Sequence, residues 1–445
     1  MTAEEKQRDM LETPVHKLIP RLAIPTIISM LVSSFYNMAD TFFVGQLHSA
    51  SATGAVGVVF SYMAVLQAIG FMLGHGAGNF ISRSLGKGEK EAASKMASSS
   101  FFYSLIAGGA LMVFGLIFIE PLSMFLGSTK TILPYTKDYL RYILIGSPYM
   151  MASFVLNNQL RFQGSAAFAM VGIVSGAVLN IALDPLLMFT FDMGIEGAAV
   201  ATASSQFVSF LVLLVGTMRG GNLKLRFKNF TVKWWVFKEI LRGGIPSLFR
   251  QGLASVSSIC LNTVAGGLGG DAAIAGMSIV GRVMMFANSA MIGFGQGMQP
   301  VTGFNFGAGN YKRVKEAFWF CVKWAAGGLA VIALAGFSFA GTIVGWFQTD
   351  PDVLAVAEWA LRFQCISFVC NAWIVPTNMM LQAVGKTGSA SLLAASRNGV
   401  LFLPPLYGLT ALFGITGLQL AQPVADLLSA LLAIPLTVRF LKEIK

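Results

Sequence analysis

Two aspartates lie inside long apolar runs, and they are the first residues in this sequence that could do chemistry. Asp40 lies near the end of the run 16–46, and Asp184 lies near the end of the run 164–190. Placing a charged side chain at bilayer depth costs from about 2.5 to more than 10 kcal/mol, so such a group is rarely kept without a role. If these runs cross a membrane, both aspartates are candidates for binding a cation or exchanging a proton.

Three uncharged residues share the depth or the helix face of these aspartates. Counted from the predicted outer ends at 1.5 Å per residue, Thr202 in the run 196–218 and Tyr139 in the run 134–160 lie about 8–9 Å below the outer surface, as do both aspartates. Asn180 precedes Asp184 by four residues and shares its helix face. We therefore expect one cation- or proton-coupling site formed by Asp40, Asp184, Asn180, Thr202 and Tyr139.

The residues around Asp184 offer oxygen ligands. Pro185 has no N–H and crowds the carbonyl of Ile181, which frees that oxygen. Carboxylate, amide, hydroxyl and freed backbone oxygens are hard ligands that suit Na⁺, and we expect no other metal. A proton needs only a desolvated carboxyl group, or two acids that share one charge. Both ions stay open, and so does the alternative that Asp184-Pro185 merely kinks its helix.

Four further residues are candidates to line a substrate cavity. Tyr36 and Asn37 lie one turn before Asp40. Arg282 lies about ten residues in from the outer side of the run 272–301, and Asp426 lies about nine in on the run 417–440, so the two could form a buried ion pair. Whether Arg250 and Arg397, which also lie in apolar runs, line the same cavity stays open.

The composition indicates a protein that uses lipid as its solvent. Of 445 residues, 55% are hydrophobic and only 11% are charged, whereas soluble domains carry about a quarter charged residues. The net charge of +11 does not indicate nucleic-acid binding, because the Lys and Arg residues lie between apolar runs and not on a basic reading face. The four cysteines all lie in apolar runs, which predicts neither disulfides nor a metal site.

Twelve runs are long enough to cross a bilayer, which needs about 20 apolar residues. The loops rich in Lys and Arg alternate with loops poor in them, and the positive-inside rule places both termini in the cytoplasm. The N-terminal residues 2–14 are polar, so we expect no signal peptide. The predicted spans are 16–46, 51–79, 96–119, 134–160, 164–190, 196–218, 240–267, 272–301, 313–346, 353–383, 388–412 and 417–440.

The second half of the chain repeats landmarks of the first half in the same order. Pro25 and Gly45 recur 221 residues later as Pro246 and Gly266. Since each half holds an even number of spans, the halves are parallel repeats. We expect an all-α integral membrane fold with two pseudo-symmetric six-helix lobes: a cytoplasmic tail (1–14), an N-lobe (15–219), a cytoplasmic linker (220–238) and a C-lobe (239–445).

The repeat does not extend to the candidate ligands. The positions that correspond to Asp40, Asn180, Asp184 and Thr202 are occupied by other side chains, namely Leu261, Val400, Pro404 and Gln422. A duplicated scaffold alone would leave symmetric chemistry, so we assign ion coupling to the N-lobe.

Several stretches resemble the multidrug and toxic compound extrusion (MATE) transporters, prokaryotic branch. They are Ala23-Ile24-Pro25 through Asp40 with Val44-Gly45, the run from Gly70-Phe71 to Gly86, Asn180 through Asp184-Pro185, and Gly293-Phe294 through Asn305-Phe306-Gly307. The resemblance covers both halves. It implies twelve helices in two lobes that export organic compounds against an inward Na⁺ or H⁺ gradient, with a cation site at the acids of the first and fifth helices. Family members with coupling acids in the C-lobe differ from this chain.

We expect a secondary active antiporter of the cell (inner) membrane that exports cationic or amphipathic drugs by alternating access, with no cofactor besides the coupling ion. The alternative is a flippase or exporter of lipid-linked precursors or anionic metabolites from the same superfamily. An intramembrane enzyme is disfavoured because three histidines cannot supply a catalytic constellation. No G-x-x-x-x-G-K-[ST] motif occurs, so we expect no direct use of ATP and no ATPase subunit. The expected partners are small amphipathic molecules and the bilayer, with no nucleic acid and with the chain acting as a monomer.

Overall fold

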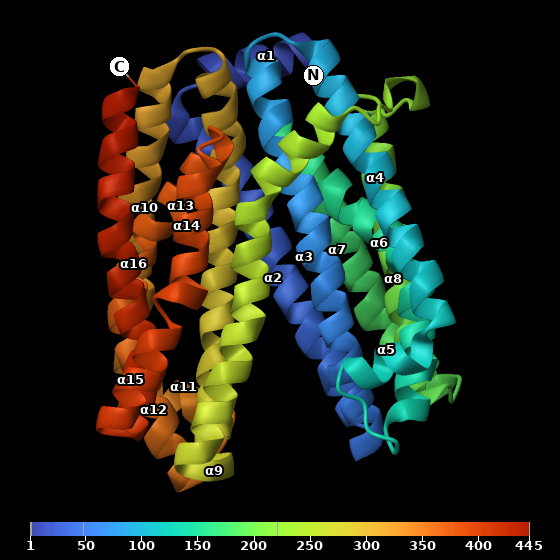
Figure 1. The fold of residues 1–445 in the computed structure, drawn as a ribbon, viewed down its shortest axis with the longest axis vertical. Helices are drawn as coiled ribbons and strands as arrows, with labels where there is room; N and C mark the ends of the chain where they lie inside the picture. Colours follow the sequence, from blue (N-terminus) through green and yellow to red (C-terminus); the bar gives the residue numbers. More distant parts are fainter. Residues whose placement is uncertain (1, 48, 220, 445) are drawn as a thin grey trace. The chain divides into compact units, whose positions relative to one another are not determined.

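The computed structural model describes residues 2–47, 49–219 and 221–444, and it is helical from end to end, with connecting turns and no strand among these residues (Figure 1). The chain divides into two compact units. The first comprises residues 1–13 and 24–244, and the second comprises residues 14–23 and 245–445.

The first unit is a bundle in which α6 (Leu133–Phe162) is the central helix. It packs against α3 (Ala50–Gly86), α4 (Lys90–Ile117), α7 (Ala166–Pro185) and α8 (Gly194–Met218). Nineteen residues of α6 are buried, in agreement with its position inside the bundle. The other elements that belong wholly or mainly to this unit are α1 (Ala3–Glu12), α2 (Val15–Gly45), α5 (Ile119–Phe125), the π-helix η1 (Leu186–Thr190) and the 3₁₀-helix η2 (Phe227–Asn229).

The second unit contains most of the residues of α9 (Trp234–Gly307). This element consists of two helices joined at a break. Gly269 and Gly270 have non-helical backbone angles there, and Gly270 adopts a φ of 58°, which glycine reaches without steric cost. The elements that follow are α10 (Tyr311–Ser338), α11 (Ala340–Gly345), α12 (Pro351–Phe368), α13 (Asn371–Ala383), α14 (Thr387–Ala395), the π-helix η3 (Ser396–Val400), α15 (Leu403–Phe413) and α16 (Ile415–Glu443).

All twelve predicted spans are helical in the structure, which confirms the predicted fold class. By length and apolar character alone, the described residues contain eight helices able to cross a membrane, or nine if the pair α12 and α13, bent by 55°, is one span. The difference from twelve has physical reasons. The single element α9 covers two predicted spans, α14, η3 and α15 divide one span between them, and α6 starts with charged residues.

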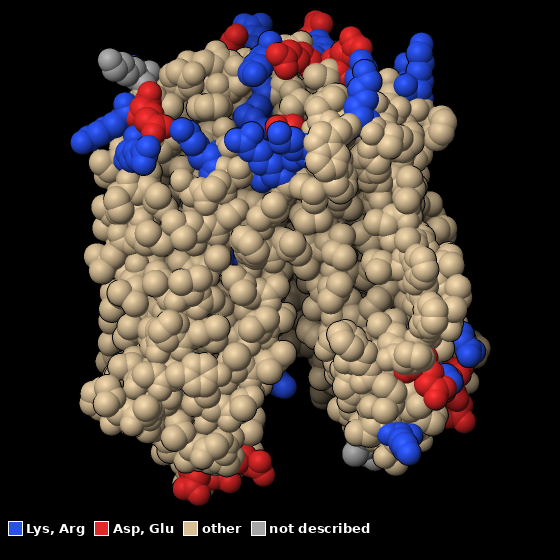
Figure 2. All heavy atoms as spheres, in the orientation of Figure 1, with Lys and Arg blue, Asp and Glu red and all other residues tan. Residues whose placement is uncertain are grey.

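The surface of each unit has the character of a lipid-facing protein. Figure 2 shows a broad band of uncharged side chains on the visible face of each unit, with Lys and Arg gathered at one end. Large apolar side chains on the outer helices are exposed, among them Phe114 at 64% and Leu334 at 69%. Water would not tolerate so much exposed apolar surface, so the protein is a multi-pass membrane protein.

The internal repeat is visible in individual side-chain contacts. The amide of Asn157 donates to the carbonyl of Ala169 at 3.2 Å, and the amide of Asn378 donates to the carbonyl of Ala390 at 2.7 Å. Each residue of the second contact follows its counterpart in the first by 221 positions. The two repeats therefore share a helix-packing contact as well as a sequence pattern.

The N-terminal helix α1 is attached to the first unit by a half-buried lysine. Lys6 donates hydrogen bonds to Ser165 and Asn222, and Met10 is 1% exposed. Burial lowers the pKa of the Lys6 ammonium to about 8.

We predict that docking of α1 strengthens as the pH rises from about 8 towards 10.5, the ordinary lysine value. In this range a docked Lys6 has lost its proton while an undocked one keeps it, so a rise in pH favours the docked state. The measurement is the hydrogen-exchange protection of α1 amides, corrected for the intrinsic pH dependence of exchange. The Lys6→Met variant should show no such trend, and the same trend in that variant would contradict this account.

Candidate functional site

The five residues predicted to form a coupling site come together in the first unit. Asp40 is on α2, Tyr139 on α6, Asn180 and Asp184 on α7, and Thr202 on α8. All but Asp40 are at most 1% exposed. Four helices thus contribute polar side chains to one place inside an otherwise apolar bundle.

Hydrogen bonds connect three of these residues. The amide nitrogen of Asn180 donates to Oδ1 of Asp184 at 3.3 Å and to Oγ1 of Thr202 at 3.4 Å. The hydroxyl of Tyr139 interacts with Thr202. Asp40 lies near enough to Asp184 for the two carboxyl groups to interact electrostatically.

Three side-chain oxygens of the site are buried and have no hydrogen-bond partner. They are Oδ1 of Asp40, Oδ1 of Asn180 and Oδ2 of Asp184. A buried acceptor without a donor costs about 1–3 kcal/mol, and more when it is charged. Three such oxygens in one cluster offer hard ligands to a small cation or an acceptor to a proton.

The local structure around Asp184 follows from its proline. Pro185 cannot donate to the carbonyl of Ile181, and the next turn is the π-helix η1, which ends the regular α-helical hydrogen bonding. Helix α8 approaches this turn closely, because a Cβ at Gly197 would lie 2.8 Å from the carbonyl carbon of Leu187. The proline and the glycine together let η1 and α8 pack close together beside Asp184.

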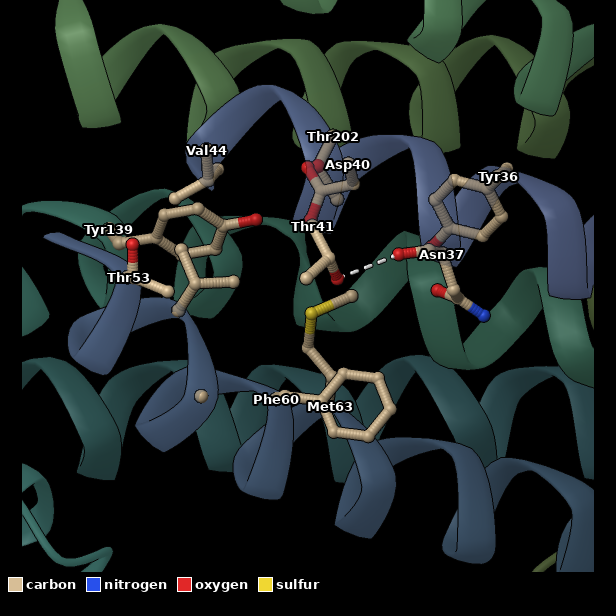
Figure 3. A pocket seen from close by; sticks show the side chains of 12 residues that line it. Tyr36, Asn37, Asp40, Thr41, Val44, Thr53, Phe60, Met63, Tyr139 and Thr202 are labelled. Atoms are coloured by element: carbon tan, nitrogen blue, oxygen red, sulfur yellow. Dashed lines mark hydrogen bonds between the residues drawn. The ribbon is translucent and has the colours of Figure 1, made fainter. Parts of the chain in front are cut away.

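A cavity of about 330 Å³ opens beside Asp40 (Figure 3). Asp40, Tyr139 and Thr202 line it, and so do the predicted substrate residues Tyr36 and Asn37. Phe60 and Met63 of α3 form an apolar part of the wall. The cavity thus joins an acidic group to apolar and aromatic surface.

A second cavity, of about 130 Å³, shares part of this wall. Both cavities are lined by Tyr36, Asn37, Phe60 and Met63. The further lining of the second cavity is made of neutral amides, hydroxyls and apolar groups, including Gln67, Ser153, Asn157, Gln206, Met150 and Phe154. Adaptable Met and aromatic surface with a few polar groups suits varied organic molecules.

The sequence reasoning missed several of these lining residues. Gln206 follows Thr202 by four residues and therefore shares its helix face, a signal that could have revealed it. Asn157 and Gln67 gave no comparable signal, because neither lies within two turns of a candidate ligand on its own helix.

Arg282 and Asp426, also predicted to line the substrate cavity, belong to the second unit, and their predicted pairing is wrong. Nε of Arg397 donates to Oδ1 of Asp426 at 2.8 Å, whereas Arg282 is exposed. Arg282 was paired with Asp426 because the two residues lie at similar depths in their predicted spans. An ion pair also requires that both side chains lie on helix faces that meet, and depth does not give this information. Gln422 and Ser367 also donate to Asp426, at 3.0 and 3.3 Å, so both of its oxygens are hydrogen-bonded.

Arg250 lies elsewhere in the second unit, on the first half of α9. Its guanidinium donates to Asn378 and to Ser247, each at 3.3 Å. Both acceptors are neutral, so this polar cluster of the second unit carries a positive charge.

The sequence matches the MatE family model twice, over residues 25–186 and 246–407. The two matches coincide with the two repeats and cover most of the chain. The chain belongs to the MatE family.

Similarity to known MATE proteins extends over nearly the full length. The chain is 30% identical to the multidrug export protein MepA of Staphylococcus aureus over 428 residues, which is 95% of this chain and 93% of that protein. A solved outward-facing structure of a multidrug resistance MATE family transporter superposes with a TM-score of 0.92 at 27% identity, covering 98% of both chains.

Another similar solved structure is that of a MOP superfamily transporter. It is a transporter from Pyrococcus furiosus described as having a binding pocket of reverse polarity that suggests a different function. Its TM-score is 0.91 at 26% identity, and the match covers 98% of each chain.

We predict that Arg397→Met destabilises the protein by about 3–5 kcal/mol, because it leaves the buried carboxylate of Asp426 without its cation. The double variant Arg397→Met/Asp426→Leu should recover most of this loss, since apolar residues of similar volume replace a buried pair with little cost. Thermal unfolding in detergent measures both effects. If the double variant were as unstable as the single one, the ion pair would not be the cause.

Proposed function

We propose that this MATE protein is a secondary active antiporter that exports organic cationic or amphipathic compounds in exchange for Na⁺ or H⁺ by alternating access. The observation that carries the proposal is the cluster of three unpartnered buried oxygens on Asp40, Asn180 and Asp184, located beside an apolar and aromatic cavity. An ion that satisfies these oxygens would bind where a substrate also fits.

The donor set is compatible with either ion. Na⁺ would be held by the carboxylates of Asp40 and Asp184, with the amide oxygen of Asn180 and the hydroxyl of Thr202 as neutral ligands. A proton would instead be shared between the two neighbouring carboxyl groups. Tyr139 would position Thr202 in either case, through the contact between their hydroxyl groups.

Coupling follows from competition for one site. Asp40 lines the larger cavity, and four residues of its wall also line the smaller one. A bound ion neutralises the acids, so a cationic substrate loses its counter-charge and α2, which carries Tyr36, Asn37 and Asp40, bends or shifts. By reciprocal linkage, the substrate weakens ion binding by the same factor.

The relatives support this proposal. The family is one of transporters, and the similar MepA protein is named a multidrug export protein. Transport, and not catalysis, is therefore the activity we assign. The described residues contain no cluster of three or more His, Cys, Asp or Glu side chains suited to a metal ion.

The second candidate function is export or flipping of a lipid-linked precursor or an anionic metabolite. The positive charge of Arg250 among neutral acceptors favours it. Against it, neither of the two cavities described above has a Lys or Arg in its lining. Binding of a dye-like organic cation compared with a polyprenyl phosphate separates the two functions.

We further propose the cell (inner) membrane as the location, with both termini in the cytoplasm and the chain working as a monomer without an ATPase subunit. In each unit, the end where Lys and Arg gather would face the cytoplasm, as the positive-inside rule requires (Figure 2).

We predict that Asp40→Asn and Asp184→Asn each reduce gradient-driven export in proteoliposomes by about 5- to 150-fold, the range of typical coupling free energies. Asparagine keeps the size of the side chain but removes the charge that a cation or proton neutralises. Asp192→Asn is the matched control, since Asp192 lies in the same unit, is exposed, and has a φ of 54° that asparagine tolerates.

Separately imposed Na⁺ and H⁺ gradients identify the coupling ion in the same vesicles. Export by the unmodified protein should respond to one of the two gradients, and the Asp40 and Asp184 variants should lose that response. Full export in both variants would refute the proposed coupling site.

A further inference from the structure

The segment that joins the two repeats displays basic and aromatic side chains to the outside. We define the linker surface as the exposed apolar residues Phe227, Val232 and Trp234 together with the exposed basic residues Lys224, Arg226, Lys228, Lys233 and Lys238. The three apolar side chains are among the most exposed large hydrophobic groups of the protein, at 75%, 75% and 71%. The segment lies wholly within the first unit.

Backbone hydrogen bonds fix the linker in place. The N–H of Leu223 donates to Gln163 at 2.6 Å, and the N–H of Arg226 donates to Ser98 at 3.2 Å. The N–H of Thr231 donates to the hydroxyl of Ser99 at 3.1 Å. The linker therefore presents its side chains on a defined backbone.

Aromatic contacts add to this attachment. The hydroxyl of Tyr103 donates to the carbonyl of Thr231 at 2.9 Å, and the Tyr103 ring lies 5.7 Å from that of Phe230. The ring of Phe102 lies 5.4 Å from Phe227 and 5.5 Å from Phe230. The neighbouring rings contact Phe227 on one side, but most of the surface of its side chain remains exposed.

The attachment points place the linker at the polar–apolar boundary of α4. Ser98 and Ser99 follow the start of α4 by eight and nine residues, or about 12–14 Å along the axis. The preceding turns carry Lys90, Glu91 and Lys95, and the continuous apolar run begins after them. The linker thus contacts α4 where its charged first turns give way to the apolar run, the level at which we expect lipid headgroups to meet acyl chains.

Each half of this surface suits a different part of a lipid. Trp and Phe side chains favour the membrane interface, where an apolar ring finds acyl chains. Basic residues next to a membrane attract anionic headgroups. Residues 219–242 contain seven Lys or Arg and one acid, Glu239, which lies 3.8 Å from Arg83. The negatively charged phosphate oxygens of lipids complement these basic side chains. A soluble acidic partner could also bind them, but it would leave the exposed aromatic rings in water.

We propose that the linker surface binds the phosphate groups of anionic phospholipids in the adjoining leaflet, while its aromatic side chains insert at the headgroup boundary. The linker then acts as an interfacial anchor between the two repeats, and the stability of the protein depends on anionic lipid. This inference requires only that the chain is embedded in a membrane, and it is independent of the transported substrate and of the coupling ion.

The test compares the full-length protein in bilayer discs of phosphatidylcholine with discs that also contain phosphatidylglycerol. Two quantities are measured: the thermal midpoint, and the number of phosphatidylglycerol molecules retained in native mass spectrometry. The linker variant Lys224→Gln/Arg226→Gln/Lys228→Gln/Lys233→Gln removes four charges at exposed positions, where the substitutions leave the packing intact. The control variant Lys87→Gln/Lys312→Gln/Lys315→Gln/Lys442→Gln removes the same charge outside the linker.

Phosphatidylglycerol should raise the midpoint of the unmodified protein and of the control variant, and the linker variant should lose at least half of the rise and of the retained lipid. Equal loss in the control variant would show an effect of net charge only and overturn the proposal. Equal retention in the linker variant and the unmodified protein would overturn it as well. A rise of the same size from soluble inorganic phosphate in phosphatidylcholine discs would indicate an ion site in place of a lipid site, and would also contradict the proposal.

Discussion

The structure depends on the cost of keeping carboxyl groups away from water. Asp184 is fully buried and Asp40 partly buried, and among the residues that the structure describes the amide of Asn180 donates to Asp184. The apolar bundle around them supplies no further donor to three of the oxygens of the site. In the proposed function a cation or proton satisfies these oxygens, and the close packing of η1 and α8 lies beside Asp184.

The two repeats share a helical scaffold but differ in whether their buried acids have hydrogen-bond and ion-pair partners. In the first unit the acids remain incompletely satisfied and one of them lines a cavity. In the second unit Asp426 is fully hydrogen-bonded and paired with Arg397. By the repeat spacing of 220, this ion pair stands where the first unit has Ala177 and Gln206, and these two residues line the smaller cavity. The buried acid of the second unit is therefore paired with a cation, whereas the buried acids of the first unit have no such partner among the described residues.

Much of the fold could be predicted because membrane spans follow from local composition. Apolar length placed all twelve predicted spans on helical residues, and counting from the span ends predicted one depth for Asp40, Asp184, Thr202 and Tyr139. What could not be predicted depends on rotation about the helix axis and on breaks in the helices. Arg397 bonds to Asp426 and Arg282 is exposed, and Arg397 lies in the π-helix η3, a break that apolar length does not predict. The contacts of the linker with Ser98 and Ser99 had no sequence signal, since they join residues about 130 positions apart through the backbone.

The most direct measurement of the central claim is the release of the coupling ion when a substrate binds. Purified protein is titrated with an organic cation in weakly buffered solution with or without Na⁺, and released protons or Na⁺ are recorded. Binding should release ions in proportion to the sites filled, and Asp40→Asn/Asp184→Asn should release none. Undiminished substrate binding with no ion release in the unmodified protein would contradict the account.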